Sequence, residues 1–139
     1  MKILIAADGS KFTLHVVNYL VEHREQFSEA QITLLNIHFP IPGRAAAHLS
    51  RAIVQDYYSD ECEKALAPAR RVLKKAGIAF DDTWKVGDPG DEIAEFAVKG
   101  KYDMVIMGSH GHGLFVNLVL GSVATKVLAA CKVPVLVIR

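Results

Sequence analysis

The chain has 139 residues, of which 51% are hydrophobic, and its 16 basic and 15 acidic residues leave a formal net charge of +1. This length suits a single domain over residues 1–139 with a substantial core, and the hydrophobic content argues against disorder. A near-neutral chain without a block of like charges is not typical of proteins whose main partner is nucleic acid or an anionic membrane.

The cysteines and the apolar runs indicate the cellular compartment in which the protein resides. Cys62 and Cys131 are isolated and form no CxxC motif, so we expect free thiols in a reducing environment. No apolar run approaches the ~18 residues that span a bilayer, and the opening apolar run is too short for a signal peptide. We therefore expect a soluble, cytoplasmic protein.

The first half of the chain predicts two strands, each followed by a helix. Residues 2–7 form a continuous apolar run, as in a central parallel strand that is covered on both faces. Helical spacing of apolar residues follows over about 11–26. A second strand is predicted over 31–37, and a long helical pattern runs from about 47 to 76. Pro68 lies inside this pattern and predicts a kink or a restart of the helix.

The second half repeats this alternation and ends on a strand. A third strand is predicted over 78–86, at an edge of the sheet, and a helix capped by Asp88 follows and ends near Gly100. A fourth strand over 102–107 is followed by a glycine-rich loop and a helix over about 120–130, and residues 132–139 form the last strand.

This alternation predicts an α/β fold with a five-stranded parallel open sheet and helices on both faces. The strand order could be 3-2-1-4-5 or 2-1-3-4-5 under right-handed crossovers. We favour 3-2-1-4-5 because strands one and four are then neighbours whose connections leave in opposite directions. Ligands bind in the crevice that opens at such a switch point. Asp8 and the loop after Gly108 would flank that crevice.

The glycine-rich loop has the spacing Gly108-x-x-Gly111-x9-Gly121-Ser122. Glycine allows a tight turn that presents bare main-chain N–H groups to an anion. Ser122 adds a hydroxyl at the start of a helix, where free N–H groups carry partial positive charge. The loop therefore predicts a phosphate cradle. A glycine-rich loop without a ligand remains the alternative.

Four segments resemble the universal stress protein family, and together they cover essentially the whole chain. They are Ile3–Ser10, Val86-Gly87-Asp88-Pro89, the glycine signature of the family's ATP-binding branch, and Val133–Val137. The resemblance implies a sheet of order 3-2-1-4-5, a homodimer and a role in stress tolerance. It also implies ATP, with Mg²⁺, as the ligand.

The resemblance further implies a set of site residues. Asp8, with the neighbouring Ala7, would contact the ribose or adenine, and the main chain around Ile37 would touch adenine. The phosphate contacts would come from the signature residues and the adjacent loop residues: Gly108, Ser109, His110, Gly111, His112, Gly121, Ser122 and Val123.

His110 and His112 stand where the family often has arginine or lysine. Imidazole is mostly neutral at pH 7, so these residues imply a weaker and more pH-dependent attraction for phosphate. The pair could also suggest a metal site, but two histidines without a third ligand are more often loop residues, and we expect no metal bound by protein side chains.

Three functions remain open from the sequence. The first is a nucleotide-dependent regulatory module, the second a slow ATPase or autophosphorylating enzyme, and the third a dimeric interaction protein that needs no nucleotide. The chain lacks a Walker motif, a dedicated general base and an arginine finger, which favours the first. A phosphorylated receiver is excluded because strand one ends in a single acidic residue, Asp8. The apolar final strand would be an exposed edge, so we expect a second copy to cover it in a homodimer.

Overall fold

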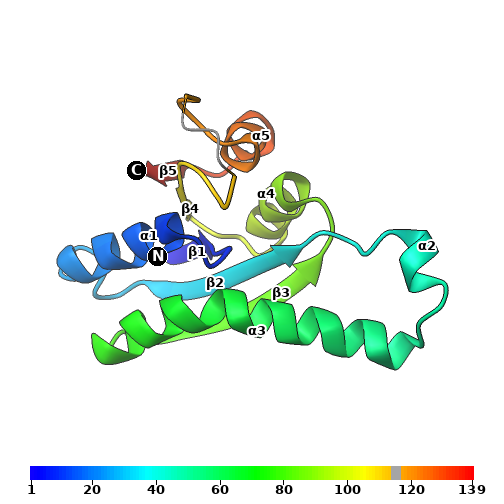
Figure 1. Ribbon diagram of the computed structural model, residues 1–139. Helices are drawn as coiled ribbons and strands as arrows, with labels where there is room; N and C mark the ends of the chain where they lie inside the picture. The colour runs from blue at the N-terminus through cyan, green and yellow to red at the C-terminus, as the bar shows by residue number, and fades with distance from the viewer. Residues whose placement is uncertain (114–116) are drawn as a thin grey trace.

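The computed structural model describes residues 1–113 and 117–139, so Leu114, Phe115 and Val116 of the glycine-rich loop lie outside the described residues. Its strands form one parallel sheet of order β3-β2-β1-β4-β5 (Figure 1), which confirms the predicted fold and strand order. The strands are β1 Lys2–Ala6, β2 Gln31–His38, β3 Phe80–Val86, β4 Met104–Gly108 and β5 Val135–Ile138.

Helices cover both faces of this sheet. They are α1 Lys11–Glu22, α2 Gly43–Ala46, α3 Arg51–Lys75, α4 Pro89–Lys99 and α5 Ser122–Ala130. Alternating side chains of β1 separate the two layers. Ile3 and Ile5 pack with residues of α1 and α3, whereas Leu4 packs with residues of α4 and α5. All three side chains are fully buried, and each such burial contributes roughly 1.5–3 kcal/mol.

The structure corrects several predicted boundaries. Helix α1 ends at Glu22 rather than 26, because the following residues form tight turns, and Phe27 packs there against the core. Helix α3 begins after Ser50, whose hydroxyl accepts a hydrogen bond from the Ile53 N–H (3.2 Å), and it runs through Pro68 to Lys75 without a restart. The short helix α2 was not predicted at all.

The connections between the strands bring the predicted site residues together at the carboxyl ends of the strands. Strand β1 lies between β2 and β4, and the connections that follow β1 and β4 leave in opposite directions. The carboxyl ends of β1 and β4 therefore bring Asp8 and the loop after Gly108 together. Within the described part of the chain, no helix is both long enough and apolar enough to span a membrane.

Candidate functional site

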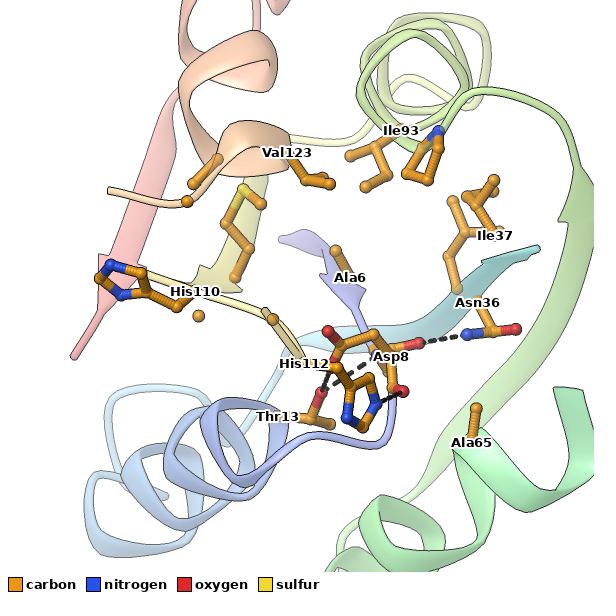
Figure 2. Close-up of a pocket in the computed structure, with 18 of the residues that line it drawn as sticks. Ala6, Asp8, Thr13, Asn36, Ile37, Ala65, Ile93, His110, His112 and Val123 are labelled. Atoms are coloured by element: carbon orange, nitrogen blue, oxygen red, sulfur yellow. Dashed lines mark hydrogen bonds between the residues drawn. The ribbon is translucent and has the colours of Figure 1, made fainter. Parts of the chain in front are cut away.

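A cavity of about 460 Å³ opens at the carboxyl ends of β1, β2 and β4, beside the first turns of α4 and α5 (Figure 2). Every predicted site residue except Ser109 lines it: Ala7, Asp8, Ile37, Gly108, His110, Gly111, His112, Gly121, Ser122 and Val123. Ser109 is 1% exposed and does not line the cavity, and its Oγ is 3.0 Å from Nδ1 of His110.

Asp8 is fixed in the cavity by its own turn. Its Oδ1 accepts hydrogen bonds from the Ser10 N–H (2.9 Å) and the Thr13 hydroxyl (2.9 Å), and its N–H donates to Thr13 Oγ1 (3.1 Å). One step before it, the Ala7 carbonyl accepts a hydrogen bond from the buried Asn36 amide (2.7 Å). The Asp8 carboxylate therefore has a fixed direction, with Oδ2 turned toward Gly111.

Close packing explains the three glycines of the signature. A Cβ at Gly108 would lie 2.5 Å from Phe12 Cβ, and one at Gly111 would lie 2.6 Å from Asp8 Oδ2. A Cβ at Gly121 would lie 3.2 Å from the main-chain Cα of His110. Each glycine thus lets the loop approach another part of the site more closely than a side chain allows.

The loop leads directly into the N-terminus of α5. The Gly121 N–H donates to the Ser109 carbonyl (2.8 Å), and the Gly121 carbonyl accepts the first helical bond, from the Thr125 N–H (3.0 Å). The N–H groups of the first turn, at residues 122–124, precede the first possible helical donor and border the cavity. Their partial positive charge suits an anion.

Aliphatic side chains of β2, α3 and α4 also line the cavity, and the sequence predicted only Ile37 among them. Ile37 on β2 and Ile93 of α4 lie on the side of the cavity away from His110 (Figure 2), and Ala65 of α3 and Pro89 of α4 also line it. The helical stripes that contain Ile93 and Ala65 could be seen in the sequence, but their meeting depends on how α3 and α4 pack. Asn36, a polar residue within an apolar strand, was a visible signal that the sequence analysis did not use.

The cavity carries little fixed positive charge. Among the described residues that line it, Asp8 and Glu61 are acidic, three are histidines, and none is lysine or arginine. A hydrogen bond from Lys64 holds the pKa of Glu61 below its ordinary value, so Glu61 is ionised at neutral pH. Lys126, the lysine nearest in sequence to the α5 N-terminus, is bound to Asp88 and Asp91 instead. The described residues also hold no group of three or more His, Cys, Asp or Glu that suits a metal ion.

Comparison with known proteins identifies the family. The model of the universal stress protein family matches residues 1–139. This chain belongs to the universal stress protein family. A universal stress protein of Methanocaldococcus jannaschii is 28% identical over 139 residues, which cover 99% of this chain and 81% of that protein.

Solved structures of universal stress proteins share the fold. UspA from Lactobacillus plantarum superposes with a TM-score of 0.81 at 18% identity, over 100% of this chain and 97% of that one. A family member from Arabidopsis thaliana, solved with AMP bound, gives a TM-score of 0.67 at 19% identity, over 99% of this chain and 90% of that one. AMP is therefore a ligand of that relative.

Proposed function

We propose that this universal stress protein is a regulatory module that binds ATP, as its Mg²⁺ complex, in the cavity at the ends of β1 and β4. The observation that carries the proposal is the polarity of this cavity. The aliphatic side chains of Ile37 and Ile93 lie on the side away from His110, and the glycine loop that leads into α5 lines the other side (Figure 2). A nucleotide has the same polarity, with a flat base at one end and phosphates at the other.

Each part of a nucleotide has a matching part of the cavity. The base fits between Ile37 and Ile93, where aliphatic side chains exclude water from its faces. The ribose hydroxyls can donate to the fixed carboxylate of Asp8, as they do to acidic residues in dinucleotide folds. The phosphates lie against the N–H groups at residues 122–124. The AMP-bound relative supports an adenine nucleotide as the ligand.

The charge balance of the cavity supports Mg²⁺ as part of the ligand. A triphosphate would lie near the carboxylate of Asp8 without a lysine or arginine in the described lining. Magnesium binds through phosphate oxygens and retained waters, so it can arrive with ATP and lower the charge of the tail. The cavity also lacks an arginine finger among its described residues, which favours binding over fast hydrolysis.

The first test is to identify and titrate the ligand. Purified protein is denatured, its supernatant is analysed for adenine nucleotides, and ATP and AMP are then titrated calorimetrically with and without Mg²⁺. We expect micromolar affinity for Mg·ATP and a roughly tenfold weaker affinity for metal-free ATP, whereas AMP is little affected by the metal. The absence of co-purified nucleotide, binding heat and thermal shift would contradict the proposal.

A pair of glycine variants tests the location of the site. Gly121→Val places a branched side chain against His110 and should weaken binding by at least roughly tenfold. Gly43→Val is the matched control, because a Cβ at Gly43 has nothing within 4 Å. Equal affinities of the two variants would place the nucleotide elsewhere.

A further inference from the structure

The ring of His110 is fully engaged inside the glycine loop. Its Nδ1 lies 3.0 Å from Ser109 Oγ, and its Nε2 lies 2.8 Å from the main-chain carbonyl oxygen of Leu118. The ring therefore joins the start of the loop to a residue eight positions later. With both nitrogens occupied, His110 has no ring nitrogen left for a phosphate, although the sequence analysis placed it among the phosphate contacts.

The partners of the ring define where its proton lies. A carbonyl oxygen only accepts, so Nε2 carries a hydrogen and donates it to Leu118. In the neutral ring, Nδ1 is then the acceptor, and the Ser109 hydroxyl donates to it. In the charged ring, the second bond reverses, because Nδ1–H donates to Ser109 Oγ. The bond to Leu118 is the same in both states.

Neighbouring contacts fix the His110 bridge, that is, the ring with its bonds to Ser109 and Leu118, beside the N-terminus of α5. The Ser109 carbonyl accepts the Gly121 N–H (2.8 Å), so the two ends of the loop are joined directly beside the ring. The ring centroids of His110 and Phe12 are 5.3 Å apart, which places α1 behind the bridge. Gly121 lies against the main chain of His110 and begins the turn whose N–H groups border the cavity.

We propose that His110 is a positioning residue of the phosphate site, which bridges Ser109 and Leu118 and so holds the loop end that precedes Gly121 and the N-terminus of α5. This inference rests on the proposed nucleotide site, and it assigns His110 a role distinct from phosphate contact. Backbone N–H groups bind an anion well only when their directions are fixed in advance, because ordering them during binding costs affinity.

The state of the ring is measurable without any nucleotide. Long-range ¹H–¹⁵N NMR spectra, recorded at a pH at which the ring is neutral, should show His110 as the Nε2–H tautomer, assigned by comparison with a His110→Gln spectrum. An Nδ1–H tautomer, or the averaged signal of a free imidazole, would overturn the bridge. This readout keeps the inference testable even if the protein binds no nucleotide and the proposed function fails.

Three substitutions of His110 then test whether its hydrogen bond to Leu118, and not simply the presence of a side chain at this position, is needed for binding. The amide nitrogen of His110→Gln extends about as far as Nε2 and can still donate to Leu118, whereas His110→Asn is too short and His110→Ala has no donor. We expect His110→Gln to bind Mg·ATP within about threefold of the wild type, and the other two to bind roughly tenfold more weakly.

Two comparisons complete the test. His48→Ala is the control, because His48 is exposed in the segment before α3 and does not line the cavity. Its affinity should equal that of the wild type. If His110→Asn and His110→Ala bind as tightly as the wild type while all fold, the positioning role is wrong, although the nucleotide site itself stands.

Discussion

Gly111 passes over the carboxylate of Asp8, and this contact leaves no room for a side chain. Asp8 cannot turn aside freely, because Ser10 and Thr13 hold its other oxygen. Gly111→Ala would place its Cβ 2.6 Å from Asp8 Oδ2 in the present geometry. Either the loop lifts or the Asp8 hydrogen bonds break, and both outcomes misplace groups that the proposed nucleotide site assigns to the ribose and phosphates.

We therefore expect Gly111→Ala to fold with nearly unchanged melting temperature but to bind Mg·ATP roughly tenfold more weakly. Isothermal titration calorimetry measures the affinity, and a thermal melt verifies the fold. Gly43→Ala, on the open surface of α2, should change neither quantity. An unchanged affinity of Gly111→Ala would mean that Asp8 and the loop do not share one ligand.

At this scale the sequence located residues better than it assigned their contacts. Asp8 and the signature glycines were visible because their types are unusual at the ends of apolar runs. The bond from His112 Nε2 to the Asp8 carbonyl (2.7 Å) was not, because it joins positions 104 residues apart. The hydrogen bond from the Asn36 amide to the Ala7 carbonyl also joins distant positions and was not visible in the sequence. Such contacts depend on the three-dimensional path of the chain rather than on local pattern.

At the scale of elements, α4 and α5 are joined by a small charge cluster. The Asp88 side chain caps α4 by accepting the Asp91 N–H (3.2 Å), as the sequence predicted for a residue before Pro89. Lys126 of α5 binds both carboxylates, at 2.8 Å from Asp88 and 2.9 Å from Asp91. The cluster keeps the first turns of the two helices together beside the cavity.

The pH dependence of stability should report this cluster. The hydrogen bond from Lys126 holds the pKa of Asp88 below its ordinary value of 3.8, and the Asp91 N–H lowers that pKa further. A carboxyl group whose pKa is lower in the folded state contributes stability above its unfolded pKa and loses that contribution as the pH falls through the folded pKa. Lys126→Met should therefore flatten the pH dependence of the melting temperature below about pH 4.

The effect at neutral pH should be small because the pair is exposed, with a fall in melting temperature of about 1–3 °C. Thermal melts between about pH 2.5 and 7 measure both quantities. Lys132→Met removes the same charge from an exposed position at which the described residues form no ion pair. If the two variants lose stability in parallel at every pH, the cluster does not couple α4 to α5.

At the scale of the whole molecule, the alternation of strands and helices already contained the sheet. Five apolar runs separated by helical segments leave few right-handed arrangements, and placing Asp8 beside Gly108 selected the correct order. The bounds of the helices between β2 and β3 were harder to predict from the sequence. Helix α2 and the late start of α3 lie where short polar and alanine-rich stretches have no clear period, so capping by Ser50 decides the boundary instead.

The open edge of the sheet, at strand β5, is where we expect a second copy of this chain to bind. Strand β5 lies at the end of the sheet order, and its side chains are only half-buried. The carbonyl of Pro134 accepts a hydrogen bond from the Val105 N–H of β4 (2.9 Å), and that of Ile138 accepts one from the Ser109 N–H just after β4 (2.8 Å). Because main-chain groups alternate along a strand, Val135 and Val137 direct their N–H and carbonyl groups toward the open edge. We propose that a second copy of this strand pairs there in a homodimer.

Substitution of Val137 tests this edge without disturbing β4. Val137→Pro removes an outward N–H and should convert the dimer to a monomer, since proline cannot donate to a new strand. Val137→Thr keeps the donor and the branched shape, so it should remain dimeric. Sedimentation equilibrium at micromolar concentration measures the mass of each. A wild type that is strictly monomeric, or a Val137→Pro variant that stays dimeric with its fold intact, would exclude pairing through β5.

Because the cavity lies at the carboxyl ends of the central strands β1 and β4, each protomer should bind nucleotide with or without its partner, so the monomeric variant should retain wild-type affinity for Mg·ATP.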